Sequence, residues 1–354
     1  MNQIERIKIK LRLAKCTDLF LEVFGADSHK YKVGKPLSLS ELTEFEKNYN
    51  IQLPESYRLF LTEVGNGGNN YPKSVRGNSA SGPNFGIYKL GSFLMGAVVN
   101  TKYGILEKEA IINSRLTEFE WNKMVEKAVK KEHDNSNEFN NSIANLYSGI
   151  LTIGYCGGSE YQAIVLNGKE KGRVLFIYDE IECCPYFAKE VNFLDWYENW
   201  LDRIISGEEI MSNDYLGELQ KEESTISDFI SQLDDNYWQF KKLGYLRYFP
   251  TLSKRSIKLL WKKYNSTTEL DQKICLLNFL TKFDYYTAKN EISAYHKAYP
   301  IPFLRNLHLY AREKTYEWKE VINRIKTDNS SNSDVLAYIE FISNHDIKTS
   351  ANNA

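Results

Sequence analysis

Four acidic residues lie at the ends of segments rich in β-branched and aromatic residues, and they are the natural candidates for acid–base chemistry. They are Glu160, Asp179, Glu180 and Glu182. A pair of carboxyl groups can act as general acid and general base in hydrolysis. No His or metal motif stands beside them in the sequence. The pattern favours a solvated acidic rim, and a hydrolase that uses Glu160, Asp179 and Glu182 is the less favoured alternative.

A binding role is a further interpretation of the same residues. Several tyrosines accompany the carboxylates, namely Tyr155, Tyr161, Tyr178 and Tyr186. Aromatic side chains are good interface anchors, and negative charge next to them complements a basic partner. An acidic rim with aromatic neighbours is therefore suited to docking a basic protein surface.

Thiol chemistry is not supported by the cysteine spacing. The chain has five Cys, an odd number without metal-ligand spacing, which fits a reducing compartment. Adjacent cysteines such as Cys183 and Cys184 chelate one ion poorly. Cys156 lies in the Gly-rich segment 154–159, which joins two predicted strands, whereas a phosphate-binding loop leads into a helix. We predict a tight strand connection there, no metal site and no cofactor.

The common catalytic templates GxxxxGK[ST], GxSxG and HExxH are missing from the sequence. The five His are scattered, and those in predicted C-terminal helices, His296 and His308, are expected to be surface or core residues and not ligands. We therefore assign no catalytic residue and predict that the protein is not an enzyme.

The charge and hydropathy of the chain exclude further classes. A net charge of −1 gives no sign of a general nucleic-acid or membrane-surface binder. The one basic run, from Arg6 to Lys15, is expected to be a solvated face. The N-terminus lacks the apolar core of a secretory signal, and no apolar run reaches the roughly 18 residues of a membrane span. These features predict a soluble, cytoplasmic protein.

Several elements are predicted before the acidic residues. Ser38 and Glu41 form a potential capping box for a helix that ends near Asn50. Pro54 begins a second helix, which Gly65 ends as a residue able to adopt positive φ. A long polar loop then occupies 65–84. We further predict a strand at 85–90 and a helix at 118–131, and either a helix or an edge strand in the first 35 residues.

The candidate residues themselves are positioned by three predicted strands and a helix. The strands are 150–153, 161–166 and 173–178, and the last two are joined by the hairpin loop 167–172. Asn192 caps a helix with a wide apolar face that Gly207 ends.

Helical periodicity alone characterises the chain beyond residue 210. Thr268 and Asp271 form a potential capping box within this region. Because 354 residues exceed one typical domain, we predict two, at 1–210 and 211–354, the second an all-α bundle or irregular helical repeat. The predicted helices are 224–235, 253–264, 268–283, 287–298, 302–313, 315–326 and 333–343.

The order of these elements over residues 35–205 resembles the SUKH superfamily, which includes yeast regulators of cell-wall assembly and many bacterial immunity proteins. The resemblance rests on three segments. The second segment is the strand region 151–180, and the third is the helix FLDWYENWL at 193–201. The first segment is a series of short motifs: Phe45-Glu46, Leu53-Pro54, Tyr57-Arg58, Phe60-Leu61 and Gly65-Asn66-Gly67-Gly68.

This resemblance implies an α+β fold with a mainly antiparallel sheet flanked by helices. It also implies a protein-binding function without shared catalytic residues. Bacterial members typically neutralise polymorphic or contact-dependent toxins, so we expect a cognate toxin domain as the partner, with neither a membrane nor a direct nucleic-acid contact. The alternative is a regulatory scaffold, like the eukaryotic members, that recruits other proteins.

The partner-binding residues are expected on the long loop, the Gly-rich turn and the acidic rim, because rigid scaffolds present functional side chains on loops. Charged and aromatic side chains there would suit an interface of anchors and rim. The predicted set is Asn69, Tyr71, Arg76, Tyr155, Glu160, Asp179, Glu180 and Glu182.

Overall fold

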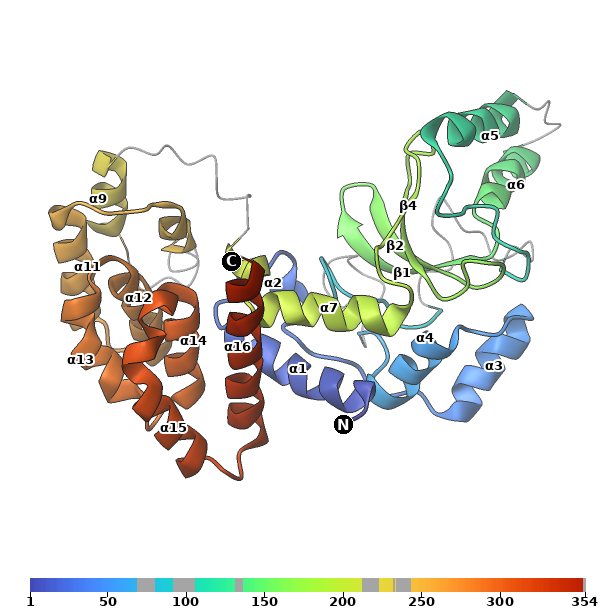
Figure 1. Cartoon of the computed structure of the whole chain (residues 1–354). Helices are drawn as coiled ribbons and strands as arrows, with labels where there is room; N and C mark the ends of the chain where they lie inside the picture. Colours follow the sequence, from blue (N-terminus) through green and yellow to red (C-terminus); the bar gives the residue numbers. More distant parts are fainter. Residues whose placement is uncertain are drawn as a thin grey trace. The chain divides into compact units, whose positions relative to one another are not determined.

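A computed structural model describes residues 1–68, 80–91, 106–130, 136–211, 223–231, 233 and 243–352 (Figure 1). The chain forms two compact units. The first comprises Met1–Lys8 and Phe24–Leu201, and the second comprises Ile9–Val23 and Asp202–Ala354. The sequence placed the whole N-terminal segment in the first domain, whereas the structure assigns residues 9–23 to the second unit. The division into independently folding domains remains a prediction.

The first unit is built around a four-stranded antiparallel sheet in the order β1-β2-β3-β4. Its strands are β1 (Ile150–Gly157), β2 (Glu160–Val165), β3 (Val174–Tyr178) and β4 (Tyr186–Phe187). This confirms the predicted α+β class, the three strands and the hairpin between β2 and β3. The predicted strand at 85–90 is wrong as an element, because only Ile87 makes isolated bridges, to Ala80 and Gly154.

Helices surround this sheet. They are α2 (Ala26–His29), α3 (Leu39–Tyr49), α4 (Glu55–Leu59), the π-helical η1 (Phe60–Val64), α5 (Glu118–Lys130) and α6 (Ser136–Leu146), with the start of α7 (Phe193–Ile205). The capping box of Ser38 and Glu41 is confirmed. Gly65 is a correction: its φ of 162° is extended backbone and not the left-handed conformation predicted for it.

An aromatic core joins α4, η1 and α7. Phe193 packs against Tyr57 and Phe60 with ring centroids 4.9 Å and 5.0 Å away. Tyr197 lies 4.7 Å from Phe60 and donates a hydrogen bond to the backbone oxygen of Ser81. The apolar face predicted for α7 is confirmed, and these rings fix its position against the rest of the first unit.

The second unit is helical, as the periodicity predicted (Figure 1). The predicted capping box at Thr268 is wrong, because Glu269 precedes α12 without a side-chain cap. The N-terminal segment forms a helix and not an edge strand. The elements are the end of α1 (Gln3–Thr17), α8 (Glu208–Met211), α9 (Glu223–Ser231), the 3-10 helix η4 (Leu243–Tyr248), α11 (Lys254–Ser266), α12 (Leu270–Phe283), α13 (Tyr285–Tyr295), α14 (Pro300–Tyr310), the 3-10 helix η5 (Arg312–Trp318), α15 (Lys319–Asp328) and α16 (Ser333–Asn352).

Several residues of the basic N-terminal run form ion pairs within one unit or the other. In the first unit, Arg6 Nε lies 2.8 Å from Glu198 Oε1. In the second, Lys10 Nζ lies 2.6 Å from Asp202 Oδ1, and Arg12 Nη2 lies 2.8 Å from Asp334 Oδ1. The prediction that this run is simply a solvated face is therefore corrected, because these three side chains form ion pairs with acidic residues.

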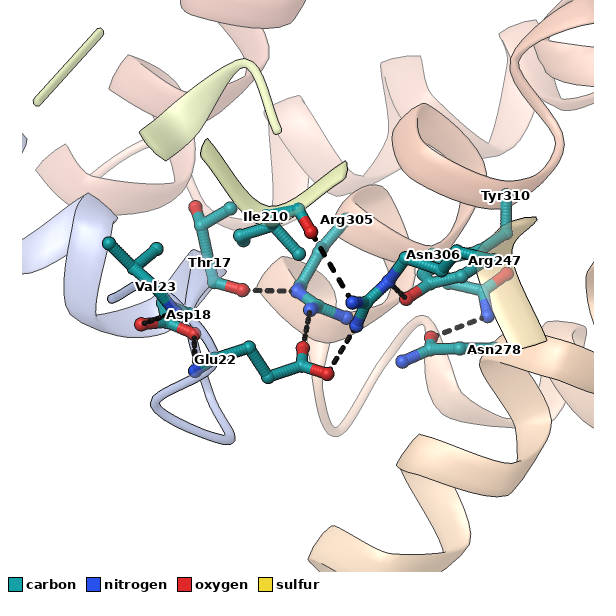
Figure 2. A network of polar contacts seen from close by, with 10 residues as sticks. All are labelled: Thr17, Asp18, Glu22, Val23, Ile210, Arg247, Asn278, Arg305, Asn306 and Tyr310. Atoms are coloured by element: carbon teal, nitrogen blue, oxygen red, sulfur yellow. Dashed lines mark hydrogen bonds and ion pairs between the residues drawn. The ribbon is translucent and has the colours of Figure 1, made fainter. Parts of the chain in front are cut away.

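A buried ionic network lies inside the second unit (Figure 2). The Glu22 carboxylate, after α1, is ion-paired with Arg247 of η4 and lies 3.9 Å from Nη2 of Arg305 on α14. Arg305 also donates to the backbone oxygen of Thr17. All three charged side chains are at most 6% exposed. Residues 17–22 therefore complete the interior of the helical unit.

The remaining contacts of this network fix its geometry. Asp18 accepts hydrogen bonds from the backbone nitrogens of Glu22 and Val23, at 2.6 Å and 3.2 Å. Arg247 Nε donates to the Tyr310 hydroxyl at 3.0 Å. Burial alone would lower the pKa of Arg247, but the adjacent Glu22 carboxylate raises it overall. The guanidinium of Arg247 therefore stays charged in the core.

Candidate functional site

The structure brings four of the predicted site residues to one end of the sheet. Glu160 begins β2 and pairs with Tyr178 at the end of β3, while Tyr155 lies opposite Tyr161. The backbone nitrogen of Asp179 donates to Ser159 at 2.8 Å. Glu180 follows directly. We refer to Glu160, Asp179 and Glu180 as the acidic end of the sheet.

The other predicted residues differ in their placement. Glu182 is exposed in the segment between β3 and β4. Asn69, Tyr71 and Arg76 lie outside the described residues, so their role remains a prediction.

Each carboxylate of the acidic end accepts a hydrogen bond from a neutral hydroxyl. Tyr186 donates to Glu160 at 2.7 Å and Tyr161 donates to Asp179 at 2.8 Å. Ser159 donates to Glu180 at 2.8 Å. A hydroxyl orients a carboxylate without neutralising it. No basic side chain of the described ranges forms an ion pair with these three residues, so hydroxyls hold their negative charge in place and no described cation compensates it.

Burial also affects Tyr186, which holds the Glu160 carboxylate. Burial and the hydrogen bond to Glu160 both raise the pKa of Tyr186. The phenol therefore remains protonated and continues to donate over the physiological pH range.

Two aromatic stacks accompany the acidic end. In the first, Tyr155 stacks on Phe85 at 5.5 Å, and Phe85 meets Phe24 edge-on at 5.1 Å. In the second, Tyr186 stacks on Phe176 at 4.7 Å. Phe24 and Tyr186 are 44% and 47% exposed, so each stack presents one ring to solvent. Exposed rings next to fixed charges are typical of protein interfaces.

Sequence reasoning missed Phe24, Phe85 and Phe176 as parts of this surface. Phe24 lies in a segment without regular structure, and the strand predicted at 85–90 did not form, so no sequence pattern indicated that the Phe24 and Phe85 rings meet. The residue in the sequence that could have indicated this aromatic stack is Gly157. It has a φ of 115°, and a Cβ there would lie 3.2 Å from the Phe85 ring. The turn after β1 needs this glycine both for its backbone and for the aromatic stack.

The site gives little support for nucleophilic or metal chemistry. Burial raises the pKa of the Cys156 thiol, and burial likewise raises that of Cys184. Neither thiol is poised as a thiolate nucleophile. Among the residues that the structure describes, no group of three or more His, Cys, Asp or Glu is arranged to hold a metal ion. What the arrangement can do is present oriented charge and aromatic surface to a partner.

The family-like motif around Glu46 has a structural role. Glu46 on α3 accepts a hydrogen bond from the backbone nitrogen of Leu53 at 2.7 Å and forms an ion pair with Arg58 on α4. One carboxylate thus fixes both the link before Pro54 and the helix after it. This pair positions two helices and does not face the acidic end of the sheet in any described contact.

Asn66 has a similar structural role in the segment Gly65-Asn66-Gly67-Gly68. Its side-chain oxygen accepts from the backbone nitrogens of Gly67 and Leu90, at 2.8 Å and 2.9 Å. Its backbone oxygen accepts from Gly34 at 2.8 Å. A Cβ on Gly67 would lie 1.9 Å from the Lys89 nitrogen, so only glycine fits between these segments. The segment therefore holds together the backbone at Gly34, at Gly67 and at Leu90.

The motifs that carry the resemblance to the SUKH superfamily thus stabilise the fold of this unit. A comparison with known families supports the same resemblance. Residues 36–199 match the SMI1 / KNR4 family (SUKH-1). This segment belongs to the SUKH superfamily. The SUKH segment includes α3 through the sheet and most of α7, and therefore all of the acidic end. The helical second unit after residue 202 lies outside the match.

No curated protein and no solved structure gives a significant match to the chain. Within the described part of the chain, no helix combines the length and apolar character needed to cross a membrane.

Proposed function

We propose that this protein is an immunity protein that binds a cognate bacterial toxin domain and blocks it by stoichiometric occlusion, without catalysis of its own. SUKH proteins are often immunity proteins, which supports the class. The observation that carries the proposal is the acidic end of the sheet. Its three carboxylates are oriented by hydroxyls and lack described cationic partners.

The proposed partner surface is basic. Fixed charges attract an opposite surface at long range and align it, while exposed rings such as Phe24 and Tyr186 supply apolar contact area. Because the hydroxyls already hold the carboxylates, little side-chain ordering remains to oppose binding. A cationic toxin face, such as one that contacts an anionic substrate, fits this surface.

The test is co-expression with the toxin encoded beside this protein, followed by isolation of the complex. The informative variant combines Glu160→Gln, Asp179→Asn and Glu180→Gln, since an amide oxygen still accepts the hydroxyl while the charge is lost. We expect toxin affinity to fall about tenfold or more, by analogy with charge pairs at interfaces. The control is Glu44→Gln with Glu63→Gln, two exposed carboxylates on α3 and η1.

Three outcomes would contradict the proposal. They are lethality of the toxin despite co-expression, the lack of any complex, and an equal loss of affinity in the control. If affinity capture from the native cell retains several host proteins and no toxin, the scaffold alternative is supported in its place.

A further inference from the structure

Helix α11 carries an unusual charge pattern on its outer face. Over its 13 residues it has Lys254, Arg255, Lys258, Lys262 and Lys263 and no acidic residue. The first four are exposed. Since helical residues four apart lie on the same side, Lys254, Lys258 and Lys262 form one row. We refer to these three lysines and Arg255 as the basic row.

The basic row is not neutralised by ion pairs within the described structure. None of its four side chains forms an ion pair or hydrogen bond with another described residue, whereas the cations on α1 and Arg58 do. The opposite face of α11 is anchored by Leu260 and Tyr264, which are buried. The row is therefore held on a packed helix, with its charges directed to solvent.

A partly buried aromatic ring flanks this row. Trp261 of α11 lies 5.6 Å from Tyr264 between ring centroids and donates from Nε1 to Asp284 Oδ2 at 2.8 Å, and Asp284 precedes α13. Figure 1 shows α11 and α13 in the same part of the helical unit. The surface thus combines cations with a partly exposed aromatic ring.

We propose that the basic row of α11, with Trp261 beside it, is a docking surface for an acidic polypeptide segment in extended conformation. Lysines four residues apart on a helix rise about 6 Å per step. In an extended chain, alternate side chains point the same way and lie about 6.6 Å apart. A segment with acidic residues at every second position would therefore match the row one carboxylate to one lysine.

A polypeptide fits the molecule better than a nucleic acid. The whole chain carries a net charge of −1, whereas proteins that bind nucleic acid usually show a basic excess that attracts the polyanion from a distance. An aromatic ring next to cations is also typical of a protein interface. The proposal concerns only the second unit and does not depend on toxin binding by the acidic end of the sheet.

The experiment measures binding of a fluorescent Glu-Ser repeat peptide to the full-length protein by anisotropy at low and moderate salt. The test variant is Lys254→Glu with Lys258→Glu and Lys262→Glu. The matched control is Lys319→Glu with Arg324→Glu and Lys326→Glu, three exposed cations on α15, where Glu320 and Asp328 are interspersed. Circular dichroism melting verifies that both variants fold.

We expect binding that weakens as salt rises, about a tenfold loss in the α11 variant, and less than about a twofold loss in the α15 control. Failure of the wild-type protein to bind the peptide at low salt would overturn the proposal. So would equal losses in the two charge variants, or tighter binding of a single-stranded DNA of equal charge.

Discussion

At the scale of single residues, the buried His29 affects how the stability of the protein depends on pH. It is 3% exposed, lies 5.9 Å from Trp200 between ring centroids, and accepts the backbone N–H of Tyr31 on Nδ1 at 3.1 Å. The proton of the neutral imidazole is therefore assigned to Nε2. Burial lowers the pKa of His29 to about 4.

This lowered pKa predicts a loss of stability in mild acid. An unfolded His takes up a proton near pH 6.5, while the folded state resists protonation until about pH 4, so the unfolded state binds more protons in between. The stabilisation is present above the unfolded pKa and is lost as the pH falls towards the folded pKa. From pH 7 to pH 5 the loss should be about 2 kcal/mol.

Urea unfolding at the two pH values measures this effect. His29→Gln supplies an acceptor that does not titrate, so the difference between wild type and variant isolates the contribution of His29 from that of the carboxylates. An identical pH dependence in both proteins would show that His29 is not the titrating group.

At the scale of elements, the contact between α3 and α4 depends on one partly buried carboxylate. Glu46 and Arg58 are 12% and 24% exposed, and Glu46 also accepts the Leu53 N–H. Removing one partner leaves the other charge without compensation in a poorly solvated place, which costs more than the pair contributes net. The two residues should therefore not behave additively.

We predict that Arg58→Met lowers the free energy of unfolding by about 1–3 kcal/mol, and that adding Glu46→Gln recovers part of this loss. A double-mutant cycle by chemical denaturation measures the coupling. Additive effects would contradict the structural role assigned to this pair. Toxin binding by the folded variants should be unchanged, because neither residue contacts the acidic end of the sheet in the described structure.

The elements differ in how well the sequence predicts them. The helices from α11 to α16 and strands β1 to β3 have clear periodicity and were predicted. The short β4 was missed, because Tyr186 and Phe187 follow Pro185 and are too few for a pattern. The acidic end was foreseen as a set of residues, but its hydroxyl partners depend on strand register and on two irregularities in β1, which no local pattern encodes.

At the scale of the whole molecule, the helical unit is discontinuous in sequence. Residues 9–23 belong to it although some 180 residues of the first unit intervene. Periodicity could show that Leu11, Leu13 and Ala14 are buried, but not against which partners. The pairing of Glu22 with Arg247 and Arg305 is a long-range result of folding that no segment of the sequence announces.

We predict that Glu22→Gln destabilises the helical unit by about 3–5 kcal/mol, since it leaves two buried guanidinium groups without a carboxylate between them. Hydrogen exchange of the full chain measures this, with the expected loss of protection in α12 and α14. Arg12→Gln, which removes the more exposed pair with Asp334, is the control and should cost about 1 kcal/mol or less. Equal destabilisation by the two substitutions would contradict the role of Glu22 as the carboxylate that compensates Arg247 and Arg305.

The discontinuity of the helical unit also has a consequence for synthesis on the ribosome. Glu22 is made 283 residues before Arg305. At translation rates of about 5–20 residues per second, the segment around it waits roughly 15–60 s for its partner. During that time Leu13, Phe20 and Val23, all buried in the finished protein, have no native site to occupy. The nascent chain therefore carries an apolar segment that chaperones can bind until the last helices emerge.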